Sequence, residues 1–166
     1  HNGVIGNFDR LKKELISAGH CFSSETDTEV IAHLIEKYYR GNFEEAVGKA
    51  VNDIEGSYTF IAMMEGNPEL VAARKDSPLI IGLGDHENFI ASDVPAILDY
   101  TNRITYLENG DLAVVTKNSI KITQNRVPVT RKEQRSPWSA GDAGRGGYEH
   151  FMLKEINEEP RVITDT

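Results

Sequence analysis

The sequence predicts one α+β domain with mainly antiparallel sheets. Two observations favour this class: apolar residues with helical periodicity occupy the first third of the chain, and short strand patterns follow one another from residue 57 onward. Because no long helix separates these strand patterns, their connections are short, which favours antiparallel pairing. The length of 166 residues, with 39% hydrophobic and 27% charged residues, is ordinary for one globular domain.

Three helices are expected near the front of the chain. The first follows Asn7 as a cap and ends at Gly19. The second begins at Thr26 or Asp27, because Thr26 and Glu29 have the spacing of a capping box. The third, capped by Asn42, lies between Gly41 and Gly56. The apolar faces of the three are formed by Phe8, Leu11 and Leu15; by Val30, Ile31, Leu34, Ile35 and Tyr38; and by Phe43, Ala46, Val47, Ala50, Val51 and Ile54.

The second half of the chain contains the strand patterns. We expect strands at 58–64, 70–74, 79–83, 88–91, 104–107, 111–116 and 119–123, with a brief helix over 93–98. Residues 125–147 are rich in Arg, Gly and Pro, which is typical of a surface loop whose basic side chains are solvated. A last periodic segment covers 148–159 and is expected to stop at Pro160.

The charge balance excludes several partners. With 18 basic and 26 acidic residues the formal net charge is −8, so nucleic acid and anionic membranes are not expected as main partners. No apolar run reaches the length of a membrane span.

A single cysteine, Cys21, rules out an intramolecular disulfide framework and fits a reducing cytoplasm. The five histidines of the chain show no metal-ligand spacing, so neither a metal nor a cofactor is predicted.

Three positions carry possible chemistry. Asn2-Gly3 is a typical hairpin turn, but an Asn amide next to a Gly N–H can also form an oxyanion hole. Asp27 is either a helix N-cap or a carboxylate that pairs with a substrate ammonium. Cys21 follows His20, but neighbours in an extended chain point to opposite sides, so Cys21 is expected to be a buried small hydrophobe rather than a nucleophile. His33 and Glu29 are expected to be a solvated helix pair.

The sequence as a whole resembles the glutaminase domain of glutamine–fructose-6-phosphate aminotransferases. Matching segments follow in the family's order over nearly the whole chain. They are His1-Asn2-Gly3-Val4-Ile5, Ser24 to Leu34, Gly56-Ser57-Tyr58, Ser77-Pro78-Leu79, Ile81 to Gly84, Glu87 to Asp93, Leu107 to Asp111 and His150 to Pro160.

This resemblance implies a fold and an activity. The fold is the αββα sandwich of N-terminal-nucleophile hydrolases, and the reaction is hydrolysis of the glutamine side-chain amide by an N-terminal Cys thiolate. Asn2 and Gly3 match the family's oxyanion-hole residues, and Asp27 matches the carboxylate that binds the α-amino group of glutamine. Ammonia then passes to fructose 6-phosphate in a sugar-phosphate isomerase domain of the same parent chain, which is expected to be a cytoplasmic homodimer.

The family's Cys-Gly-Ile opening and its Arg-Trp-Ala-Thr-His-Gly segment do not occur in these residues. The resemblance therefore implies that residues 1–166 are the C-terminal part of a glutaminase domain, missing its first strands and its nucleophile and inactive by themselves. Two alternatives stay open. One is the glutaminase domain of another amidotransferase, of the amidophosphoribosyltransferase or glutamate synthase type. The other is a non-catalytic module that binds an amino acid.

Overall fold

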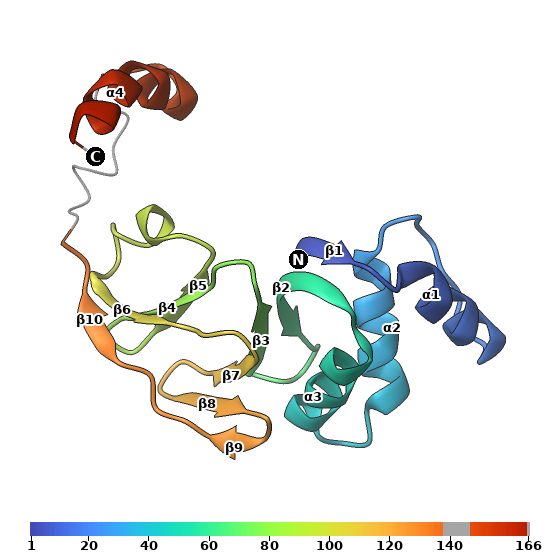
Figure 1. Ribbon diagram of the computed structural model, residues 1–166. Helices are drawn as coiled ribbons and strands as arrows, with labels where there is room; N and C mark the ends of the chain where they lie inside the picture. The colour runs from blue at the N-terminus through green and yellow to red at the C-terminus, as the bar shows by residue number, and fades with distance from the viewer. Residues whose placement is uncertain (138–146, 166) are drawn as a thin grey trace.

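The computed structural model describes residues 1–137 and 147–165. Its elements run in the order β1 (Asn2–Ile5), α1 (Phe8–Ser17), α2 (Thr28–Tyr38), α3 (Phe43–Asp53), β2 (Gly56–Met63), β3 (Leu70–Lys75), β4 (Ile80–Leu83), β5 (Asn88–Ala91), η1 (Val94–Ala96), β6 (Arg103–Tyr106), β7 (Asp111–Val115), β8 (Ile120–Gln124), β9 (Val127–Pro128), β10 (Glu133–Arg135) and α4 (Phe151–Asp165). Figure 1 shows their arrangement. The positions of the three front helices and of the main strands confirm the sequence prediction, but Asn7 does not cap α1: its side chain bonds the Asp53 carbonyl and the Glu55 N–H instead.

The strands form two antiparallel sheets. One has the order β1-β2-β3-β7-β8-β9 and the other the order β10-β6-β4-β5. Every pairing is antiparallel, as the short connections predict. The chain enters the six-stranded sheet at β1, leaves it after β3 and returns at β7, so the first strand of the chain lies at one end of that sheet.

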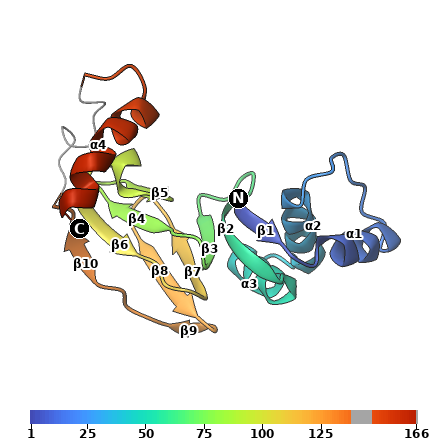
Figure 2. The ribbon, with the colours of Figure 1, turned by 45° about the horizontal axis from the view of Figure 1, so that its top comes forward.

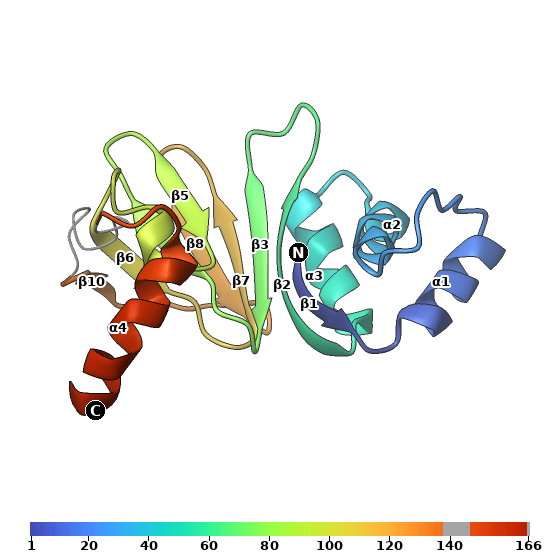
Figure 3. The same ribbon diagram turned by 90° about the horizontal axis from the view of Figure 1, so that it is seen from above.

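The six-stranded sheet is buried on both faces (Figure 3). Helices α1, α2 and α3 cover one face, where their apolar stripes pack against alternate residues of β2, β3 and β7 such as Phe60, Val71 and Val114. The residues between them on the strands, such as Ala72 and Ala113, face the second sheet and pack against its Leu79, Ile81 and Leu107. The outer face of the second sheet is covered by the segment around η1, through Val94, Ile97 and Leu98.

Two expectations for the end of the chain are corrected. Segment 125–137 contains two short strands, β9 and β10, which extend one end of each sheet; the rest of the expected loop, 138–146, lies outside the described residues. Pro160 lies inside α4 rather than ending the preceding segment. A proline ring fixes φ near the helical value, so the helix continues at the cost of a main-chain hydrogen bond.

The expectation that the basic residues of 125–147 are solvated is wrong for Arg131. Its Nε and Nη2 donate to the two carboxylate oxygens of Asp111 at 2.8 and 2.7 Å, and Nη1 lies 2.9 Å from Oε2 of Glu108. Asp111 begins β7 and its side chain is fully buried. The Asp111 carboxylate raises the pKa of Arg131, so this buried bidentate pair joins the 125–137 segment to the core.

Within residues 1–137 and 147–165, each helix is too short or too polar to traverse a lipid bilayer.

Candidate functional site

Asn2 and Gly3 lie in an edge strand rather than a hairpin turn. In β1, Asn2 pairs with Thr59 and Gly3 pairs with Tyr58 of β2. The turn expected from the dipeptide alone is therefore wrong, because a partner strand more than fifty residues away fixes this backbone. Gly3 has φ +132°, a conformation that side-chain-bearing residues rarely adopt. Figure 2 shows β1 at the end of the sheet, beside α2.

The main-chain N–H of Gly3 points to the free edge of β1. Gly6 N–H donates to Glu55 O at 2.7 Å, toward the β2 side. Ile5 N–H points the other way and donates to Asp27 Oδ2 at 2.9 Å. Because N–H direction alternates along a strand, Gly3 shares the direction of Ile5. The Gly3 N–H is thus directed away from β2, along the edge that Asp27 lines.

Asp27 immediately precedes α2, yet its side chain is turned to β1. Its Oδ2 accepts the Ile5 N–H, and its Oδ1 lies 3.8 Å from His1 Nδ1. The His1 imidazole is held in turn at 2.9 Å from Thr28 Oγ1. The Asp27 side chain therefore makes no N-cap hydrogen bond to α2, and its carboxylate contacts the chain at Ile5 and His1 instead. Its side chain is 27% exposed, so a ligand can reach it.

The Asn2 side chain lies next to this edge. Strand alternation places Ile5 on the helix face of the sheet, where it is buried, and Asn2 on the opposite face beside Thr59. Thr59 donates through Oγ1 to the Ser77 carbonyl at 2.9 Å, whereas Asn2 is exposed. A side-chain amide and the N–H of the next residue are therefore both accessible at one end of β1. Two such donors are what stabilises a developing oxyanion.

The turn before α2 is anchored by Glu29. Its carboxylate accepts the N–H groups of Ser23 and Ser24 at 2.7 and 2.8 Å, together with both of their hydroxyls. These bonds, the Ser23 N–H first and the Ser24 hydroxyl next, lower the pKa of Glu29 to about 2. The carboxylate thus serves Ser23 and Ser24 instead of the capping box expected with Thr26. This ionised anchor fixes the segment that carries Asp27.

Replacing Gly3 with alanine is expected to weaken the β1–β2 pairing. An alanine Cβ at Gly3 would overlap the main-chain oxygen of Ser57, and the positive φ adds strain. We expect a loss of about 1–3 kcal/mol in the free energy of unfolding, measured by urea denaturation. Gly41→Ala is the matched control, because Gly41 also has a positive φ (+93°) but its Cβ would meet open space. Equal losses in the two variants would contradict the clash.

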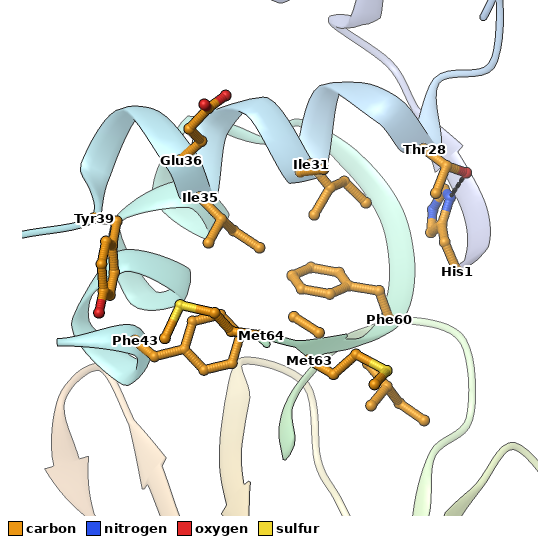
Figure 4. A pocket seen from close by; sticks show the side chains of 13 residues that line it. His1, Thr28, Ile31, Ile35, Glu36, Tyr39, Phe43, Phe60, Met63 and Met64 are labelled. Carbon is orange, nitrogen blue, oxygen red and sulfur yellow. Dashed lines mark hydrogen bonds between the residues drawn. The ribbon is translucent and has the colours of Figure 1, made fainter. Parts of the chain in front are cut away.

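An apolar cavity of about 500 Å³ adjoins the site (Figure 4). It lies between α2 and the part of β2, from Phe60 onward, that does not pair with β1. Its lining is mostly apolar, including Ile31, Ile35, Phe60 and Met64, and His1 and Thr28 close the end nearest Asp27. This lining offers burial but little polar chemistry, whereas the polar candidates Asn2, Gly3 and Asp27 lie on or against β1.

Two expectations about reactive side chains are corrected. Cys21 is exposed rather than buried, because the loop after α1 carries it at the surface. His33 and Glu29 are not a solvated pair: their side chains are only 16% and 15% exposed, since the same loop folds over them. The loop also brings His20 to His33 and Glu36, a grouping that sequence spacing missed. Only the i,i+3 spacing of His33 and Glu36 signalled part of it.

Taken together, the fold and the edge site define a class. The two antiparallel sheets with helices on one face match solved N-terminal-nucleophile amidotransferases. One is the glutamine phosphoribosylpyrophosphate amidotransferase of B. subtilis in complex with ADP and GMP (TM-score 0.66, 26% identity, 74% of this chain and 28% of that one). Another is described as the allosteric regulatory enzyme of purine biosynthesis (TM-score 0.64, 27% identity, 74% and 27%).

The chain belongs to the glutamine amidotransferase domain family, whose model matches residues 1–99. Among curated proteins, it is 48% identical to the glutamine–fructose-6-phosphate aminotransferase [isomerizing] of Caldanaerobacter subterraneus subsp. tengcongensis, over 100% of this chain and 28% of the relative. The enzyme of the same name from Aquifex aeolicus is also 48% identical, with the same coverage. That from Pyrococcus horikoshii is 49% identical over 99% of this chain and 28% of the relative. The chain therefore spans little more than a quarter of the length of these relatives.

Proposed function

We propose that the chain is the C-terminal part of the glutaminase domain of a glutamine–fructose-6-phosphate aminotransferase. In this role the complete domain hydrolyses the side-chain amide of glutamine and supplies ammonia for glucosamine 6-phosphate synthesis, and residues 1–166 by themselves are expected to be inactive. The observation that carries the proposal is the position of the Asp27 carboxylate on β1, the strand that contains Asn2 and Gly3: its Oδ2 accepts the Ile5 N–H and its Oδ1 lies 3.8 Å from His1 Nδ1. Identity of about one half to enzymes of that name over the whole chain supports the choice of substrate.

The proposed roles follow from charge and geometry. The Asn2 amide and the Gly3 N–H donate to the oxygen that becomes negative when the glutamine amide is attacked. Asp27 pairs with the α-ammonium of glutamine, since a buried ammonium needs a charged partner. The Ile5 N–H holds Oδ2 of Asp27, and the ammonium contact is assigned to Oδ1, which lies 3.8 Å from His1 Nδ1.

The reaction also needs a nucleophile. Cys21 is exposed on the loop after α1, and we assign it no catalytic role. The proposal takes the nucleophile to be the N-terminal Cys of the family, outside residues 1–166, so hydrolysis is expected only in a longer polypeptide. The parent is proposed to be a cytoplasmic homodimer that also carries a sugar-phosphate isomerase domain, and 125–147 is proposed to be a surface loop of the glutaminase domain.

The test measures glutaminase activity of the parent polypeptide, and of residues 1–166 alone, with glutamine and with glutaramate, which lacks the α-amino group. For the parent, Asp27→Asn is expected to raise KM for glutamine at least tenfold and to leave glutaramate turnover unchanged. Glu25→Gln is the control, because Glu25 is 96% exposed and lies two residues away. Equal losses on both substrates would remove Asp27 from ammonium binding. Equal activity of residues 1–166 and the parent would overturn the fragment assignment.

The solved neighbours favour one competing function, that of an amidotransferase acting on phosphoribosylpyrophosphate. Supplying the parent with glutamine and either fructose 6-phosphate or phosphoribosylpyrophosphate separates the two. Glucosamine 6-phosphate is the expected product. Formation of phosphoribosylamine instead would favour the competing function.

A further inference from the structure

Two imidazoles and one carboxylate converge on the outer side of α2. His33 and Glu36 are on the same face of α2, one turn apart, and His20 reaches them from the loop after α1. The His20 Nδ1 lies 3.3 Å from the His33 Nδ1 and 2.9 Å from Glu36 Oε2, and the His33 Nδ1 lies 3.2 Å from the same oxygen. Glu36 is one of the residues that line the apolar cavity, and Figure 4 shows its carboxylate directed away from the other lining side chains.

These three distances, from 2.9 to 3.3 Å, are at or slightly below the edges of a zinc coordination tetrahedron. Zinc binds imidazole nitrogen and carboxylate oxygen at about 2.0–2.2 Å, which places neighbouring ligand atoms about 3.3–3.6 Å apart. The observed triangle is thus close to the size that a zinc ion needs. Glu36 is 68% exposed, so a fourth position is open to water. The grouping of two nitrogens with one carboxylate oxygen is typical of zinc sites.

The surroundings of His33 point to a ligand independently. Its Nε2 is buried and lacks a hydrogen-bond partner among the described residues, and it faces Glu29 Oε1 at 3.6 Å. If Nδ1 binds a metal, the ring proton must lie on Nε2, where it faces that carboxylate. A histidine ligand whose second nitrogen faces a carboxylate is the usual outer arrangement of metal sites. Glu29 is itself fixed by Ser23 and Ser24.

Aromatic packing holds the rings in this orientation. The Phe22 ring lies 4.4 Å from the His33 ring, and the rings of His20 and His33 meet edge to face at 5.1 Å. The ligand atoms are therefore positioned by the fold rather than by flexible side chains, and little rearrangement is needed to bind an ion.

We propose that His20, His33 and Glu36 form a zinc-binding site that joins the loop after α1 to α2. In place of the direct contact between His20 Nδ1 and His33 Nδ1, each nitrogen forms a coordinate bond to the ion. It also fixes the loop that leads to Asp27, and Glu29 supports the site from outside. This proposal is independent of the glutaminase assignment, because it uses other residues and a different readout.

The test is Zn²⁺ titration of the metal-free chain by calorimetry, together with Co²⁺ titration followed by visible absorption. We expect one Zn²⁺ per chain, a tetrahedral Co²⁺ spectrum and a rise in Tm with Zn²⁺. His20→Asn and Glu36→Gln are each expected to weaken Zn²⁺ binding at least tenfold. Glu29→Gln should weaken it about 10–100-fold through the outer carboxylate.

His150→Asn is the matched control, because His150 is 75% exposed and lies far along the sequence in the segment before α4. It should bind Zn²⁺ like the unmodified chain. Circular dichroism of each metal-free variant checks folding. If His20→Asn unfolds, Glu36→Gln still tests the site, because Glu36 is exposed and its replacement should leave the fold intact. No Zn²⁺ binding by the unmodified chain, binding that survives both ligand variants, or equal loss in His150→Asn would each overturn the proposal.

Discussion

Replacing Asn2 with alanine in the parent polypeptide is expected to lower kcat for glutamine hydrolysis about 10²–10³-fold, with little change in KM. The proposed role of the Asn2 amide is to donate to an oxyanion that exists only in the transition state, so its removal leaves glutamine binding nearly intact. The exposed position of Asn2 on an edge strand makes a folding defect small in comparison. Steady-state kinetics with glutamine measures both constants.

Asn118→Ala is the control for the Asn2 variant, because Asn118 is an exposed amide in the turn between β7 and β8, away from β1. Its kcat should equal that of the unmodified enzyme. A loss confined to KM in Asn2→Ala would assign Asn2 to substrate binding and contradict its oxyanion role.

Replacing Arg131 with methionine is expected to destabilise the fold by about 3–5 kcal/mol. The change leaves the fully buried carboxylate of Asp111 without its cation, although its Oδ2 still accepts the Glu108 N–H at 2.8 Å. Removing one member of a buried ion pair costs more than the pair contributes, because the remaining charge is still desolvated. Urea denaturation followed by circular dichroism measures the loss.

Arg103→Met is the matched control for the Arg131 variant. Arg103 also makes a bidentate pair, with Glu133, but both side chains are more than 40% exposed. Its loss should be below about 1 kcal/mol, since water screens an exposed pair. The double variant Arg131→Met/Asp111→Leu should regain much of the stability. If the double variant is as unstable as Arg131→Met, lost packing and not the unpaired charge is responsible.

Local patterns were sufficient for the helices and main strands. Asn42, for example, caps α3 as expected by accepting the Glu45 N–H at 3.0 Å. The apolar run at 70–74 likewise predicted a strand, which the structure has as β3 (Leu70–Lys75). These features depend on contacts between residues a few positions apart. Within one helix or strand, the spacing along the sequence determines which side chains are neighbours.

Local patterns failed where a distant partner decides the conformation. The Asn2-Gly3 dipeptide has the composition of a turn, but pairing with β2 makes it a strand. Arg131 lies in a segment with the composition of a solvated loop, but the buried Asp111 draws it inward. In both cases the long-range contact outweighs the local preference.

The sequence by itself determined the α+β class, the order of the main elements and the identity of Asn2, Gly3 and Asp27 as site candidates. Only the tertiary structure decided that the Asp27 carboxylate leaves its helix and lies along β1, and that a surface loop brings His20 to α2. The physical reason is that hydrogen-bond direction at a strand edge and the convergence of side chains from separate segments depend on how elements pack, which residue spacing does not record.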